Sequence, residues 1–304
     1  MDPTDYTVGP DTAGQRLDLY LKDRLPEGSR KAAKRLLDAG RVRVNGRKII
    51  IASWQLKRDD KVAIVGESEP AADVSQFFLK VVFEDDAILV VDKDAGIPCE
   101  ESAQSLKPSL VQIINAYLMK KGPPGARAYL GLLHRLDADT SGLMVYAKKK
   151  TANRLSAQFK DHSIERRYWA LVQGQVDKEQ GLIRTFLEKG SGPRKVRITE
   201  GETGKKAETH FRVLERYRDA TLVELRPTTG RTHQIRVHLA HIEHPLLGDR
   251  LYGRPDSDPL KCRRQALHAA VLGFVHPVTD KKLKFTSDLP KDMRRLVDKL
   301  RLSA

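Results

Sequence analysis

The residues between positions 134 and 142 combine side chains that could carry acid–base or nucleophilic chemistry. This nine-residue stretch, HRLDADTSG, contains one Arg, two Asp, two hydroxyl residues and a Gly. It lies between two apolar segments, at 132–133 and 143–146. So many polar groups are costly to hold there unless they are exposed in a turn or paired in a site. Taken alone, the stretch favours a polar turn in which Asp139 or Thr140 caps the next element. The alternative is a site in which one carboxylate acts as a nucleophile or a general base.

The stretch is similar to the HRLDxxTSG signature of the RluA-type pseudouridine synthases. The segment at 166–174 resembles that family's KxYxAxVxG motif, and the segment at 229–239 resembles its TGRxHQIRxHL motif. Further segments that resemble family motifs, in the family's order, are 88–96, 204–209, 248–253 and 267–277. The chain is therefore identified as a member of this family over roughly residues 80 to 290.

The resemblance implies an isomerase that converts uridine to pseudouridine in structured RNA. The reaction breaks the N1–C1′ bond, turns the base and joins C1′ to C5, so the uridine must first leave its stack. It needs one ionised carboxylate beside the ribose, which either attacks C1′ or takes the proton on C2′. Because nothing is oxidised and no outside group is transferred, we expect no cofactor. We assign no metal to the histidines, since no HExxH motif or matching Cys pair accompanies them. Those histidines are His233, His238, His241 and His244.

By the resemblance, the catalytic residues are Asp137, Tyr168 and Arg236. Asp137 matches the catalytic carboxylate, and Asp139 is assigned to the turn through its side-chain acceptor. Arg236 matches the Arg that pairs with that Asp, because a nearby guanidinium favours the ionised carboxylate; the alternative is a structural ion pair elsewhere in the core. Tyr168 matches the aromatic residue that stacks on the uracil and relays the C5 proton, although ordinary strand packing would also explain a Tyr in this run.

Two further residues are assigned to substrate binding by the same resemblance. Arg135 matches the Arg that moves toward the space left by the flipped base; its alternative is a plain phosphate contact. Leu267 matches an apolar residue that lines the base pocket, and core packing explains it nearly as well.

The charge of the chain indicates a polyanionic partner. The 304 residues include 55 Lys and Arg against 40 Asp and Glu, a formal charge of +15. Phosphate neutralisation by such a surplus releases condensed counterions and drives binding to nucleic acid. Residues 14–65 alone contain 14 Lys and Arg against six Asp and Glu. A helix expected at 29–39 carries four cations that we assign to RNA binding: Arg30, Lys31, Lys34 and Arg35.

The remaining signals define the organisation of the chain. A hairpin with an Asn-Gly turn is expected at 42–49, and residues 14–65 resemble the small RNA-binding domain named after a protein of the small ribosomal subunit. We therefore predict an extension at 1–13, this domain at 14–65, a linker at 66–78 and a catalytic domain at 79–304. With two cysteines, no signal peptide and no apolar run long enough to span a bilayer, we expect a cytoplasmic protein and no membrane partner.

The overall prediction is an α+β fold with a long mixed, largely antiparallel sheet, flanking helices and a central cleft, preceded by the small α/β domain. The favoured substrate is large-subunit ribosomal RNA, by analogy from the N-terminal domain, and we expect a monomer that needs no protein partner. One alternative is a non-catalytic RNA-binding or ribosome-assembly factor, against which the trio Asp137, Tyr168 and Arg236 argues. A second alternative is a glycosidase, but its chemistry requires two facing carboxylates and gives no reason for a surplus of cations.

Overall fold

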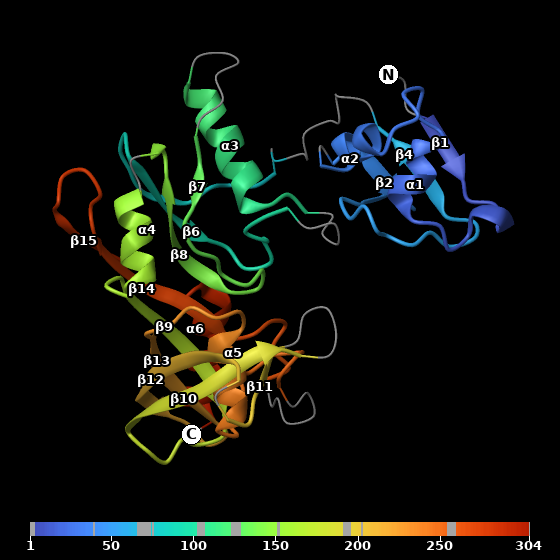
Figure 1. Cartoon of the computed structure of the whole chain (residues 1–304). Helices are drawn as coiled ribbons and strands as arrows, with labels where there is room; N and C mark the ends of the chain where they lie inside the picture. Colours follow the sequence, from blue (N-terminus) through green and yellow to red (C-terminus); the bar gives the residue numbers. More distant parts are fainter. Residues whose placement is uncertain are drawn as a thin grey trace. The chain divides into compact units, whose positions relative to one another are not determined.

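The computed structural model describes residues 4–38, 40–65, 74, 76–101, 107–122, 129–150, 153–190, 196–201, 203–253 and 260–303. The chain divides into two compact units (Figure 1). The first comprises Met1–Gln76 with Glu101–Pro108, and the second Phe77–Glu100 with Ser109–Ala304. Most of the linker predicted at 66–78 lies outside the described residues.

The first unit is a four-stranded antiparallel sheet with two short helices. Its strands are arranged in the order β1-β4-β2-β3. Apolar side chains from both helices, including Leu17, Tyr20, Leu21 and Leu37, are fully buried against the sheet. The elements are β1 (Thr4–Thr7), a 3-10 helix (Pro10–Thr12), α1 (Leu17–Lys22), α2 (Arg30–Asp38), β2 (Val42–Val44), β3 (Arg47–Lys48) and β4 (Lys61–Ile64).

The predicted hairpin in this unit is confirmed. Strands β2 and β3 pair antiparallel, and the two residues between them, Asn45 and Gly46, have φ values of 53° and 75°. A two-residue turn with both central residues in the left-handed region matches the twist of the flanking strands, and Asn-Gly is the pair that tolerates it best. The helix expected at 29–39 is α2, which begins at Arg30 and is described as far as Asp38.

The second unit contains an 11-stranded sheet in the order β11-β10-β12-β13-β9-β14-β8-β6-β5, with β15 added to β14 and β7 to β8. All of these pairs are antiparallel except β14 with β8, which is parallel. The long mixed, largely antiparallel sheet predicted from the sequence is therefore confirmed. The strands are β5 (Val81–Glu84), β6 (Ile88–Lys93), β7 (Gly131–Leu132), β8 (Ser141–Ala147), β9 (Glu165–Gln173), β10 (Gln180–Lys189), β11 (Val196–Ile198), β12 (Lys205–Arg216), β13 (Ala220–Pro227), β14 (Leu267–Val275) and β15 (Lys282–Thr286).

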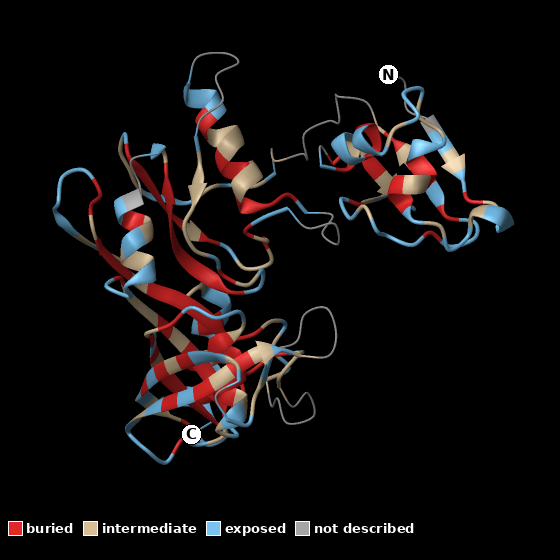
Figure 2. Ribbon diagram, viewed as in Figure 1, coloured by how far each residue is buried: buried red, intermediate tan, exposed pale blue. Residues whose placement is uncertain are grey.

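Helices cover this sheet and bury its central strands. All seven residues of β8 are buried, which explains its continuous apolar sequence (Figure 2). Leu155 of α4 packs with β6 and β8, Met293 and Val297 of α6 pack with β9 and β13, and Val237 of α5 packs with β10 and β12. The helices are α3 (Leu110–Lys121), α4 (Asn153–Lys160), α5 (Gln234–His241) and α6 (Lys291–Leu302). No helix within the described ranges has the length and apolar character that crossing a bilayer requires.

Candidate active site

The loop that carries Asp137 joins β7 to β8, and two main-chain hydrogen bonds help to fix it. The Thr140 amide donates to the Asp137 carbonyl at 3.0 Å, and the Gly96 amide donates to the Ala138 carbonyl at 2.9 Å. Asp139 is exposed, and its carboxylate makes no hydrogen bond to any residue that the structure describes. The turn therefore does not use the side-chain acceptor that the sequence suggested for Asp139.

A buried lysine also holds this loop. The Lys93 side chain, at the end of β6, is 1% exposed, and its Nζ donates to the Asp94, Ile97 and Ala138 carbonyls at 3.0, 2.9 and 2.8 Å. Burial lowers the pKa of Lys93 to about 8, because a low-dielectric site disfavours the charged ammonium. Three carbonyl acceptors compensate part of that penalty and place Ala138 next to β6.

Gly142, which follows the loop, is required by the packing of β8 against β14. Its φ is +117°, and a Cβ there would lie 2.3 Å from the carbonyl oxygen of Ala269. Since only Gly adopts this conformation readily and permits so close an approach, the final Gly of HRLDADTSG brings the start of β14 next to the loop.

Asp137 faces Arg236, which lies 99 residues later on α5. Nη1 of Arg236 donates to Oδ2 of Asp137 at 2.9 Å, and the Asp137 side chain is 26% exposed. The other two guanidinium nitrogens, Nε and Nη2, donate to the Asp249 carboxylate at 2.7 and 2.8 Å. The Arg236 and Asp249 side chains are 9% and 1% exposed. One cation thus joins a reachable carboxylate to a buried one.

The electrostatics of this group keep both Asp249 and Arg236 charged. Burial acts to raise the pKa of Asp249, but the Arg236 fork and the amides of Leu251 and Tyr252 outweigh it and lower the pKa overall. Burial likewise acts to lower the pKa of Arg236, and its hydrogen bonds to Asp249 and Asp137 raise it overall. Arg236 therefore presents a fixed positive charge to Asp137.

The start of α5 brings His233 to the same carboxylate. His233 adopts a left-handed conformation with φ of 53°, and its Nε2 lies 3.8 Å from Oδ1 of Asp137. Its Nδ1 lies 2.9 Å from the hydroxyl of Tyr252, whose ring lies 5.2 Å from the Arg236 guanidinium. A non-Gly residue in this region is uncommon and is often found at functional sites.

Two other histidines of the cluster, His238 and His244, make structural contacts. His238 is buried between the hydroxyls of Thr185 and Thr209, each 2.9 Å away, and burial lowers its pKa to about 4, so it is neutral. His244 contacts the Gln173 carbonyl. Within the described ranges, no three His, Cys, Asp or Glu residues are grouped to hold a metal ion.

Tyr168 and Leu267 lie on adjacent strands, β9 and β14. Tyr168 is 8% exposed and pairs in register with Leu225 and Ala269. Burial raises the pKa of its hydroxyl, and the charge of Asp137 raises it further. Leu267 is 4% exposed and pairs with Ala170. The structure thus places Arg236 in contact with Asp137, and the Tyr168 hydroxyl lies close enough to Asp137 for its charge to act on it.

The other predicted binding residues are exposed. Arg135 is exposed and forms an ion pair with Glu100 at 3.0 Å. On α2, Arg30 donates to Asp18 at 2.7 Å and Arg35 pairs with Glu27, while Lys31 and Lys34 are exposed. The four α2 cations belong to the first unit.

Sequence reasoning did not assign a role to Asp249, Lys93 or His233. Asp249 follows Gly248 in one of the segments that resemble family motifs. Its role could have been inferred from the chemistry of Arg236. A buried Arg needs a carboxylate partner, and an acidic residue soon after the Arg236 helix was available to supply it. His233 and Lys93 also stand in quoted motifs, but nothing in their residue types separates contact with the Asp137 loop from ordinary packing.

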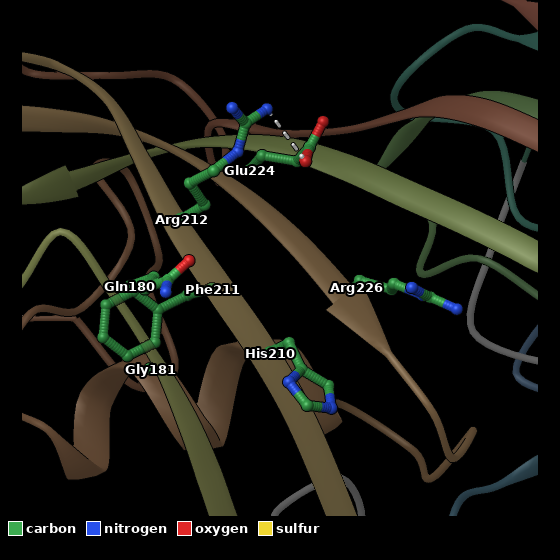
Figure 3. A pocket seen from close by; sticks show the side chains of 7 residues that line it. All are labelled: Gln180, Gly181, His210, Phe211, Arg212, Glu224 and Arg226. Atoms are coloured by element: carbon green, nitrogen blue, oxygen red, sulfur yellow. Dashed lines mark hydrogen bonds and ion pairs between the residues drawn. The ribbon is translucent and has the colours of Figure 1, made fainter.

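A hollow of about 450 Å³ lies over β10, β12 and β13 (Figure 3). Arg212 is paired with Glu224 at 3.3 Å there, and Phe211 lies beside Gly181. The hollow is lined by Gln180, Gly181, His210, Phe211, Arg212, Glu224 and Arg226. None of the residues predicted to be catalytic borders it, so we assign it no part in the chemistry.

Comparison with known proteins gives consistent matches over both units. Residues 87–241 match the family model described as RNA pseudouridylate synthase, and residues 15–62 match the S4 domain. The chain is 38% identical to the ribosomal large subunit pseudouridine synthase D of Zymomonas mobilis, covering 99% of each protein. It is 36% identical to the ribosomal large subunit pseudouridine synthase C of Vibrio cholerae, over 97% of this chain and 96% of the other.

The solved structures agree with these matches. The human protein named RNA Pseudouridylate Synthase Domain Containing 1 superposes on this chain with a TM-score of 0.57 at 26% identity, covering 77% of this chain and 98% of that one. The human protein named RNA Pseudouridylate Synthase Domain Containing 4 superposes with a TM-score of 0.59 at 23% identity, covering 73% of this chain and 93% of that one.

Proposed function

Because this chain belongs to the RNA pseudouridylate synthase family, we propose that it converts uridine to pseudouridine in large-subunit ribosomal RNA with Asp137 as the catalytic carboxylate. The relatives named ribosomal large subunit pseudouridine synthases C and D support the choice of RNA, as does the S4 domain. The net charge of +15 suits a polyanionic substrate.

The ion pair between Asp137 and Arg236 carries the assignment of the carboxylate. Asp249 is 1% exposed and uses both of its oxygens on Arg236, so it cannot reach a substrate. Asp137 is 26% exposed and is held at one oxygen only by the guanidinium, at 2.9 Å. A carboxylate that is partly reachable, and that the guanidinium holds at one oxygen only, keeps its orientation and can still contact a substrate.

The reaction then needs few groups. The uridine leaves its stack, its N1–C1′ bond breaks, and C1′ bonds to C5 after the base turns; the C5 proton is lost and N1 gains one, so the product is an isomer. Asp137 acts at the ribose, either by attack on C1′ or by removal of the C2′ proton. Tyr168 contacts the uracil and relays the C5 proton, Leu267 lines the base pocket, and Arg135 occupies the gap left in the RNA.

Asp137→Asn tests this assignment, with Asp139→Asn as the matched control two residues away. Asn keeps the shape of the side chain and removes its charge, so we expect RNA binding to persist while pseudouridine formation in a single turnover becomes undetectable. Asp139→Asn should retain near wild-type activity, because its carboxylate is exposed and holds no part of the loop. An active Asp137→Asn variant, or an inactive Asp139→Asn variant, would refute the assignment.

The choice of RNA has a separate test. Pseudouridines mapped in ribosomal and transfer RNA from cells with and without this gene should differ in large-subunit ribosomal RNA. A difference confined to transfer RNA would be consistent with pseudouridine formation but would refute large-subunit ribosomal RNA as the substrate.

A further inference from the structure

A largely buried arginine outside the Asp137–Arg236 pair also holds the loop that carries Asp137. Arg264 lies three residues before β14, and its side chain is 11% exposed. Its Nη1 donates to the Asp139 carbonyl at 3.0 Å, and its Nη2 donates to the Ser141 hydroxyl at 3.3 Å. The same guanidinium therefore contacts Asp139 of the loop and Ser141 at the start of β8, which are 125 and 123 positions away in the sequence.

Arg264 is itself fixed on two sides. Its Nη1 also donates to the Gln265 and Leu267 carbonyls at 3.0 and 3.2 Å, which orients the side chain along its own segment. On the other side, Nε and Nη2 contact the Asp292 carboxylate at the start of α6, at 2.6 and 3.1 Å. Burial acts to raise the pKa of Asp292, but Arg264 outweighs it and lowers the pKa overall.

Side chains close to Arg264 in the sequence make further contacts with residues 140 and 141. Nε2 of Gln265 donates to the Thr140 hydroxyl at 3.1 Å, and Nδ1 of His268 lies 3.0 Å from the Ser141 hydroxyl. Residues 139, 140 and 141 are thus each bound by a side chain from residues 264–268. Lys93 binds the Ala138 carbonyl at 2.8 Å, and Arg236 binds Asp137 itself at 2.9 Å.

We propose that Arg264 is a positioning residue for pseudouridine formation: anchored by Asp292, it fixes residues 139–141 against the start of β14 and so sets where Asp137 stands relative to Arg236. The proposal rests on the proposed function, which makes Asp137 the catalytic group. Displacement of a reacting group by a fraction of an ångström to one ångström lowers the rate of the chemical step without weakening substrate binding.

The shape of the guanidinium explains why this position requires Arg. A planar fork with five N–H donors can serve Asp292, the Asp139 carbonyl and the Ser141 hydroxyl together. A lysine ammonium at the same place is a point charge on a flexible stem and cannot match all of these directions. Arg264→Lys therefore keeps the charge and removes the geometry.

Arg301→Lys is the matched control. Arg301 lies at the other end of α6 and makes a similar fork to Glu215, at 2.9 and 2.6 Å, on β12. It makes no contact with residues 137–141 within the described chain. Both substitutions keep a positive charge and remove one Arg–carboxylate fork at α6, so Arg301→Lys shows the effect of losing a fork that does not reach residues 137–141.

The test is single-turnover pseudouridine formation with enzyme in saturating excess over a ribosomal RNA transcript, alongside the Kd for that RNA. Arg264→Lys should lower the single-turnover rate by between about tenfold and a hundredfold and change the Kd by less than about twofold. Arg301→Lys should leave both within about twofold. Equal losses in the two variants, or an unchanged rate in Arg264→Lys, would overturn the proposal, as would a loss that appears in the Kd and not in the rate.

Two additions keep the result interpretable. If Arg264→Lys does not fold, Asp292→Asn takes its place: it keeps Arg264 and weakens only its anchor, so a smaller loss of the same kind is expected, and a wild-type rate refutes the proposal. Amide hydrogen exchange at Thr140 should be faster in the Arg264 variant and unchanged in Arg301→Lys. That readout does not depend on activity, so an inactive wild-type protein would refute the proposed function while exchange still decides whether Arg264 holds the loop.

Discussion

Asp249 holds two of the three guanidinium nitrogens of Arg236, at 2.7 and 2.8 Å, from a side chain that is 1% exposed. Only Nη1 of Arg236 remains directed at Asp137. The direction of the cation is therefore set before any RNA arrives, and Asp249 controls the site through Arg236 without contacting the substrate.

Asp249→Asn should destabilise the fold strongly, because it leaves Arg236 buried with its main countercharge removed. Loss of one partner of a buried ion pair typically lowers the free energy of unfolding by about 3–5 kcal/mol. The control is Glu215→Gln, which removes the carboxylate from an exposed fork with Arg301 and should lower the free energy of unfolding far less, because solvent screens that pair. Denaturant unfolding of the two variants measures the difference, and equal values would contradict the role given to Asp249.

Substitution of Arg236 separates its charge from its geometry. Arg236→Lys keeps a positive charge near Asp137 but cannot serve both carboxylates with a planar fork. Arg236→Met removes the charge as well and leaves Asp249 without its partner. We expect the single-turnover rate to fall in the order wild type, Lys, Met. A Met variant as active as the Lys variant would show that a positive charge at position 236 does not contribute to the activity of Asp137.

The sequence predicted the family, the α+β class and the N-terminal S4 domain, and all three are confirmed. Local signals sufficed for the Asn45-Gly46 hairpin and for buried strands such as β8, because turn chemistry and apolar runs act over a few residues. The contacts that fix the Asp137 loop could not be derived in this way. The parallel pairing of β8 with β14 brings Ser141 to His268 across 127 residues, and no local pattern encodes that neighbour. The catalytic roles of Asp137, Tyr168 and Arg236 stay predictions.

Tyr168→Phe tests the hydroxyl separately from the ring. Burial raises the pKa of this hydroxyl, so it stays protonated at neutral pH. If it relays the C5 proton, the variant should still bind RNA while product formation falls by about a hundredfold or more, the usual contribution of acid–base catalysis. Tyr217→Phe is the control, since Tyr217 is also buried but packs with α6. Full activity in Tyr168→Phe would remove the relay role.

The α2 cations should contribute affinity and no chemistry. Lys31 and Lys34 are exposed, whereas Arg30 and Arg35 are already paired with Asp18 and Glu27. Replacing both lysines by Gln should flatten the dependence of log K on log salt by about 0.7 to 0.9 for each RNA phosphate that is no longer neutralised. The single-turnover rate at saturating enzyme should not change. An unaltered salt slope would mean that this face of α2 does not contact the RNA backbone.

Lys93 should make the stability of the protein depend on pH in the alkaline range. Its pKa is lowered to about 8 by burial in the folded state and is about 10.4 in an unfolded chain. Between these values the folded protein has released the proton and the unfolded chain still binds it. Unfolding therefore takes up a proton, and the contribution of Lys93 to stability rises with pH through this window, by at most about 1.4 kcal/mol per pH unit.

Lys93→Met cannot titrate, so the free energy of unfolding of the wild type minus that of this variant should increase between about pH 8 and pH 10, while the contributions of other groups cancel. Lys80→Met is the control. A hydrogen bond to Asp94 raises the pKa of Lys80, so its contribution to stability is lost only above the normal lysine range and should not rise within the window. Urea unfolding of the three proteins at several pH values decides the matter. If the wild type minus Lys93→Met difference in the free energy of unfolding stays constant or falls with pH, burial does not lower the pKa of Lys93.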